Sequence, residues 1–84
     1  MKLMNDLIRK LDQEKIVFKD VYYSDCPDIE DHSLNINDRV YIQVPSDGRI
    51  ELCVCHIMVD GHVHFYPITG NFDRIVRYLR ACSV

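Results

Sequence analysis

The sequence has no apolar run that approaches the ~20 residues needed to span a membrane as a helix. Its amino-terminal segment, residues 1–15, is amphipathic and lacks the uninterrupted apolar core of a signal peptide. A strong excess of one charge is also missing, because 13 acidic and 10 basic side chains leave a formal net charge of −3. These absences argue against a membrane protein, a polybasic membrane binder and a direct nucleic-acid binder. There are no internal repeats, and the 84 residues are predicted to form one domain, residues 1–84.

Disulfides are not expected either, although the chain contains four cysteines. Cys53 and Cys55 lie two residues apart on one predicted strand, where they cannot easily bridge each other. Since no secretory signal is recognised, we predict reduced thiols and a cytoplasmic protein. No cofactor is predicted.

Two amphipathic segments predict helices near the ends of the chain. Residues 2–14 place apolar side chains three and four positions apart, which is the helical spacing. Residues 72–81 do the same and follow Asn71, a favourable N-cap. Residues 16–23 are rich in β-branched and aromatic types and predict a strand. After them we expect a long loop, with strand residues only near its end, at residues 33–37.

Residues 39–68 predict a three-stranded antiparallel meander. Asp60-Gly61 lies between alternating apolar runs, which predicts a two-residue type I′ turn that pairs Ile57 with His64 and Cys55 with Tyr66. For the first turn, a three-residue loop at residues 46–48 keeps the apolar side chains on one face. That loop pairs Val44 with Ile50, Ile42 with Leu52 and Val40 with Val54. The predicted buried face consists of Val40, Ile42, Val44, Ile50, Leu52, Val54, Met58, Val63 and Phe65. The opposite, open face gathers Arg39, Tyr41, Gln43, Glu51, Cys53, Cys55, Ile57, Val59, His62, His64 and Tyr66.

These elements predict the fold class α+β, as a two-layer sandwich. Its order is helix, strand, long loop, three-stranded antiparallel meander, helix. Both helices are expected on one sheet face, because the sheet has only one strongly apolar face to cover.

A cluster of acidic residues is the clearest functional signal. Between residues 20 and 38 there is no Lys or Arg, and the field there is strongly negative. The cluster comprises Asp20, Asp25, Asp28, Glu30, Asp31 and Asp38. It is either a solvated loop or a patch that meets a basic surface on a partner protein.

The open face supplies two further candidates. The predicted register places Cys53, Cys55, His62 and His64 together, as metal ligands or as a thiol with a histidine base. Their one-residue spacings differ from those of usual zinc sites, which favours ordinary half-buried sheet residues. Aromatic and aliphatic groups with few charges also resemble an interface core, so a homodimer through this face is an alternative. The predicted aromatic contacts with a partner are Tyr22, Tyr23, Tyr41 and Tyr66.

The amino-terminal segment carries a family resemblance. Residues 5–11 (NDLIRKL) and 15–19 (KIVFK) resemble the start of a group of small phage anti-CRISPR proteins that block RNA-guided DNA nucleases. The element order with its Asp-Gly turn is also similar. The resemblance implies a non-enzymatic inhibitor whose carboxylates imitate DNA phosphates in the cleft that reads the short duplex motif beside the target. After the meander this chain is basic, whereas those family members are acidic. Segment 20–38 is therefore the only one whose carboxylates could imitate DNA phosphates.

The leading prediction is therefore a small non-enzymatic protein-binding module. Its partner would carry a basic surface, as a nucleic-acid-handling host complex does, and the module would act as an inhibitor encoded by a phage or mobile element. A homodimeric interaction protein is the second interpretation. A small Cys/His metal- or thiol-dependent protein is the third.

Overall fold

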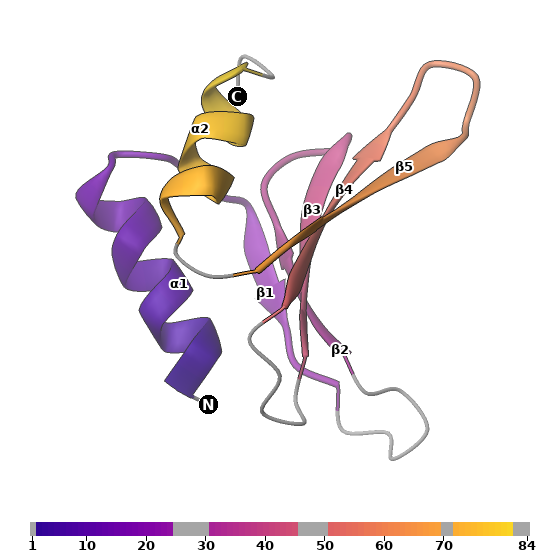
Figure 1. The fold of residues 1–84 in the computed structure, drawn as a ribbon. Coiled ribbons are helices and arrows are strands. Elements are labelled where there is room, and N and C mark those ends of the chain that lie inside the picture. The colour runs from indigo at the N-terminus through magenta and orange to yellow at the C-terminus, as the bar shows by residue number, and fades with distance from the viewer. Residues whose placement is uncertain (1, 25–30, 46–50, 70–71, 82–84) are drawn as a thin grey trace.

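The computed structural model describes residues 2–24, 31–45, 51–69 and 72–81. Its elements, in chain order, are α1 (Lys2–Gln13), β1 (Asp20–Tyr22), β2 (Asp31–Asn35), β3 (Val40–Pro45), β4 (Leu52–Ile57), β5 (Val63–Ile68) and α2 (Asp73–Ala81). The strands form one antiparallel sheet in the order β1-β2-β3-β4-β5, and both helices lie on the same side of it (Figure 1). The predicted α+β sandwich is confirmed. Within the described residues, neither helix is long and apolar enough to cross a membrane.

Helix α1 ends in a Schellman motif. The Ile16 N–H donates to the Leu11 carbonyl at 2.9 Å, and the Lys15 N–H donates to the Asp12 carbonyl at 3.1 Å. Lys15 has a φ of 58°, in the left-handed region that this motif usually reserves for glycine. Leu11 and Ile16 are both buried, which supplies the apolar contact that accompanies the motif. The cap turns the chain back toward the sheet.

The core lies between the helices and one sheet face, which we call the helix face. Alternate residues of every strand point to it, as strand geometry requires. The helix face consists of Val21, His32, Leu34, Val40, Ile42, Val44, Leu52, Val54, His56, His64, Tyr66 and Ile68. It packs against buried side chains of α1 (Met4, Leu7, Leu11) and α2 (Ile75, Val76, Leu79).

The described residues form a five-stranded sheet, whereas the sequence predicts four strands and a few further strand residues at 33–37. β1 is only the end of the predicted strand 16–23, and β2 begins inside the predicted long loop. β2 is polar, with Leu34 its only fully buried side chain. It forms because it lies between β1 and β3 and is hydrogen-bonded to both.

The β3–β4 register differs from the prediction by two residues. The structure pairs Ile42 with Val54 and Val40 with His56, so the predicted pairs with Leu52 and Val54 are wrong. A shift of two residues keeps every side chain on its predicted face. Hence Val40, Ile42, Val44, Leu52 and Val54 are all buried, as predicted. The predicted loop at residues 46–48, buried Ile50 and the Asn71 cap lie outside the described residues.

The β4–β5 register differs by one residue, and this difference exchanges the two faces of β5. The structure pairs Ile57 with Val63 and Cys55 with Phe65. The Met58 N–H donates to the His62 carbonyl at 2.7 Å, and the Gly61 N–H donates to the Met58 carbonyl at 3.0 Å. The loop is therefore three residues long, with Gly61 at a φ of 90°, instead of a two-residue type I′ turn.

The exchange corrects several predicted positions. Phe65 is 57% exposed rather than buried, Met58 is 36% exposed, and Val63 is half-buried on the open face. His64 and Tyr66 move from the open face to the helix face.

Candidate protein-binding surfaces

The open face of the sheet faces away from both helices. It consists of Asp20, Tyr22, Asp31, Ser33, Asn35, Tyr41, Gln43, Pro45, Cys53, Cys55, Ile57, Val63, Phe65 and Pro67. Its character changes across the sheet, from acidic and polar at β1 and β2 to apolar at β4 and β5. These two ends offer different chemistry to a partner.

Polar side chains order the β1–β2 end of the open face. The Asn35 Nδ2 donates to the Asp20 carboxylate at 2.6 Å, and the Ser33 hydroxyl donates to the Asn35 Oδ1 at 2.8 Å. Asp38, in the turn before β3, accepts from the Lys19 ammonium at 3.2 Å, and both side chains are well exposed. Asp20 is therefore held in place at the surface, whereas the Lys19–Asp38 pair is exposed and contributes little.

Two tyrosines lie at the end of the edge strand β1. Tyr22 is 55% exposed and shares the open face with its cross-strand partner Ser33. Tyr23 is 48% exposed and packs the edge of its ring against His32, with ring centres 5.3 Å apart. The His32 Nδ1 in turn accepts the Ser24 N–H at 2.9 Å. We call Asp20, Tyr22, Tyr23, Asp31 and Asp38 the acidic edge. The predicted acids Asp25, Asp28 and Glu30 lie outside the described residues.

The thiols of Cys53 and Cys55 lie together on the open face. Their sulfurs are 4.0 Å apart, and Tyr41 lies opposite Cys55 on β3. Burial raises the pKa of the Cys55 thiol to about 12, and burial also raises the pKa of Tyr41. A hollow beside Cys53 holds about 200 Å³, less than the 300–1,000 Å³ typical of small-molecule sites.

The predicted Cys/His cluster does not form. His64 lies on the helix face and Cys55 on the open face, so the sheet separates the proposed nucleophile from its base. On β3, the residue that faces Cys55 is Tyr41. His62 directly follows the three-residue β4–β5 loop, with its Nδ1 2.8 Å from the Asp60 carboxylate. Among the described residues, no three potential ligands gather into a metal site.

Tyr66 is also not part of the open face. Its ring packs on Tyr78 of α2 with ring centres 4.8 Å apart, and the His64 Nδ1 lies 3.2 Å from its hydroxyl. This contact joins the β4–β5 hairpin to α2. The predicted place of Tyr66 on the open face is therefore wrong, whereas Tyr41 lies there as predicted. A partner contact at Tyr66 stays a prediction.

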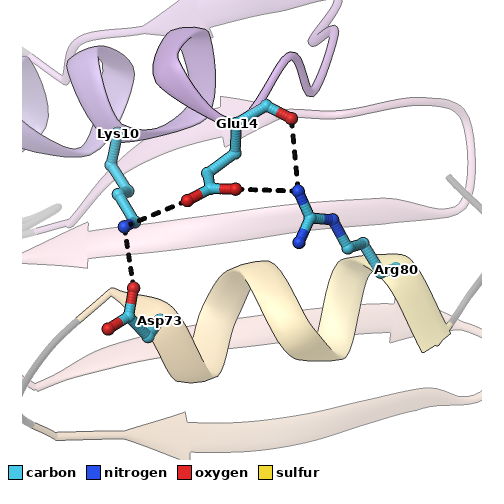
Figure 2. A network of polar contacts seen from close by, with 4 residues as sticks. All are labelled: Lys10, Glu14, Asp73 and Arg80. Carbon is cyan, nitrogen blue, oxygen red and sulfur yellow. Dashed lines mark hydrogen bonds and ion pairs between the residues drawn. The ribbon is translucent and has the colours of Figure 1, made fainter.

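A charged network joins α1 and α2, on the side of the sheet opposite the open face (Figure 2). The Lys10 ammonium donates to Asp73 at 2.7 Å and to Glu14 at 3.2 Å, and Arg80 donates to Glu14 at 2.7 Å. Hydrogen bonds from Lys10 hold the pKa of Asp73 below its usual value, and Lys10 followed by Arg80 does the same for the pKa of Glu14. Arg80 thus ties α2 to Glu14 at the end of α1.

No protein-family model, curated protein or solved structure matches this chain. The anti-CRISPR resemblance of residues 5–11 and 15–19 stays a prediction.

Sequence reasoning missed two features of these surfaces. His32 positions Tyr23, but a histidine in a polar segment gives no signal until β2 is recognised as a strand. Phe65 was expected in the core, and only the length of the β4–β5 loop decides its face. The hydrophobic pattern of β5 favours the wrong face, because Val63 and Phe65 are more apolar than His64 and Tyr66.

Proposed function

We propose that the protein is a small, non-enzymatic protein-binding module that docks through its acidic edge onto a basic surface of another protein. The observation that carries this proposal is the position of exposed Tyr22 on the open face with Asp20 and Asp31, with exposed Tyr23 next to it at the same sheet edge. Tyrosines are enriched among the residues that dominate binding energy at interfaces. Carboxylates raise the rate of encounter with a basic partner.

The same surface is suited to a particular kind of partner. Between residues 20 and 38 the chain has six carboxylates and no Lys or Arg. A protein that normally binds nucleic-acid phosphates offers the complementary basic surface. Together with the resemblance of the amino-terminal segment, this supports an inhibitor that occupies the basic cleft of a nucleic-acid-handling complex.

A catalytic role has less support. A thiol nucleophile needs a lowered pKa and a base within hydrogen-bond reach. Burial raises the pKa of Cys55 instead, and His64 lies across the sheet. These observations favour binding over thiol catalysis.

The test is capture of the partner followed by measurement of its affinity. A tagged chain would be exposed to host extract, and the captured protein purified and titrated by calorimetry at several salt concentrations. Replacing Tyr22 and Tyr23 with alanine should raise Kd about 30-fold or more, since loss of one interface hot spot costs 2 kcal/mol or more. The variant D28N/E30Q/D31N should bind more weakly and with a flatter salt dependence.

Val59→Ala is the matched control. Val59 is 91% exposed but lies in the β4–β5 loop at the other edge, so its loss should leave Kd unchanged. Duplex DNA should compete with the protein for the captured partner. The proposal fails if the tyrosine and acidic variants bind as well as the parent, and the inhibitor form fails if DNA does not compete.

A further inference from the structure

The two edges of the sheet differ in length and charge. β1 has three residues, with Lys19 and Asp20 at its start, and a short, charged edge resists pairing with another strand. β5 has six residues and carries no Asp, Glu, Lys or Arg. It is the last strand of the sheet, so one side of its backbone has no neighbour among the described strands.

The hydrogen-bonding pattern fixes which groups of β5 point outward. Met58 and His62 are a hydrogen-bonded pair, and such pairs alternate along an antiparallel ladder. His64, Tyr66 and Ile68 therefore bond to β4. Val63 and Phe65 direct their N–H and C=O groups away from the sheet. The next residue of that series is Pro67, which has no N–H to offer.

We infer that the outer edge of β5 pairs antiparallel with β5 of a second copy, forming a two-fold symmetric dimer with a continuous sheet. An outward-facing edge with two complete N–H and C=O pairs is self-complementary under a two-fold axis. In the register that places Val63 opposite Phe65 of the second copy, all of these outward groups find partners. Sliding the second copy by one hydrogen-bonded pair in either direction gives two other registers. One places Val63 opposite Pro67, and the other places Phe65 opposite Gly61. They lose bonds, because Pro67 has no N–H and the Gly61 N–H already bonds to Met58.

Side chains favour the same partner. On the open face, Val63 lies opposite Ile57 of β4, and Phe65 lies opposite Cys55. Dimerisation would place Phe65 of each copy beside Val63 of the other, an apolar cross-strand pair. No like charges meet, because β5 has none. The loop end of the β4–β5 hairpin also projects away from both helices, so they do not obstruct a second copy there (Figure 1).

The interface is small, which sets its strength. A standard complex buries about 800 Å² per partner, which would be about 15% of the 5474 Å² that this chain exposes. One six-residue edge with Phe65 and Val63 covers less than that. The dimer should therefore be weak and form reversibly as the protein concentration rises.

Amide hydrogen exchange on the unmodified protein tests the inference directly. At high concentration the Val63 and Phe65 amides should exchange at least ten times more slowly than in dilute solution. The His64 and Tyr66 amides, which already bond to β4, serve as internal controls and should change little. Exchange of Val63 and Phe65 that is equally fast at both concentrations would refute the paired edge.

Two variants distinguish dimerisation through backbone hydrogen bonds of β5 from dimerisation through apolar contact alone. F65P removes one outward N–H without removing any bond to β4, whereas F65T removes the ring and keeps the N–H. By sedimentation, F65P should be monomeric at concentrations where the parent and F65T still dimerise. A parent that stays monomeric, or equal loss of dimer in both variants, would contradict the proposal. Neither variant touches the acidic edge, so partner capture through Tyr22 and Tyr23 can succeed or fail independently.

Discussion

Two alanine substitutions on opposite faces of the sheet test whether the β4–β5 register is correct. Ile42 lies on the central strand β3, is fully buried on the helix face, and is flanked by Leu34 and Val54. Phe65 lies on the open face and is 57% exposed. Hydrophobicity alone would rank Phe65 as the more costly loss, because it is the larger side chain.

The structure reverses that ranking. Ile42→Ala removes buried methylene groups and leaves a cavity between helices and sheet, at a cost of about 3 kcal/mol within the usual range of 2–5. Phe65→Ala removes a ring of about 200 Å² of which less than half is buried. Loss of about 85 Å² of burial, at about 25 cal/mol per Å², costs about 2 kcal/mol. The total stability of a chain of this length is about 4–12 kcal/mol, so the difference is easily measured.

Urea denaturation followed by circular dichroism provides the assay, in dilute solution so that any dimer is dissociated. With an m-value of about 1.5 kcal/mol/M, Ile42→Ala should lower the midpoint by about 2 M and Phe65→Ala by only about 1.4 M. Val54→Ala should resemble Ile42→Ala, because Val54 is also fully buried on the helix face. If Phe65→Ala were as costly as Ile42→Ala, Phe65 would be a core residue. The three-residue loop at Gly61 would then be wrong.

Two further outcomes concern the helices. Lys10 holds the pKa of Asp73 in the folded protein below its value in the unfolded chain. The pair therefore stabilises the fold at pH values above about 4, the ordinary carboxyl pKa. This stabilisation is lost as the pH falls through the lower pKa of the folded protein. Asp73→Asn should therefore flatten the acid limb of stability against pH, and an unchanged slope would argue against the network in Figure 2. Lys15→Gly should stabilise by about 1 kcal/mol, since the φ of 58° strains any side chain with a Cβ, whereas Lys15→Ala should be nearly neutral.

The helices and the core face could be predicted because their signal is local and repeated. Leu7 and Leu11 of α1 and Ile75 and Leu79 of α2 recur at helical spacing, and all four are buried. In β3 and β4 the alternation is strong enough to assign each face. It does not reveal the shift of two residues, since both registers bury the same side chains.

β2 could be predicted only in part, from strand residues at 33–37, and the β4–β5 register could not be predicted, for different reasons. The residues of β2 have little intrinsic strand preference, and pairing on both sides is what stabilises them. At Asp60-Gly61, a type I′ turn and a three-residue loop with a left-handed glycine suit the same sequence. The choice between them decides the face of Phe65 and His64.

The candidate site was predicted in part. The tyrosines beside acidic residues were identified from composition, and Asp20, Tyr22, Tyr23, Asp31 and Asp38 do lie along β1 and β2 or in the turn that follows. The Cys/His cluster failed because it depended on the register of β5. A site made by neighbouring residues of one segment survives a register error, whereas a site made across two strands does not.

The two proposals, taken together, lead to a structural consequence. β1 and β5 are the opposite edges of one sheet, so pairing through β5 would leave the acidic edge of each copy uncovered, at the two ends of a continuous sheet. Such a dimer would present two identical acidic edges to its target. A target with two basic surfaces at a matching separation would be held by both, and the second contact would form at a raised effective concentration. A weak β5 pair would therefore strengthen binding to such a target, and F65P should then lower that affinity without altering the acidic edge itself.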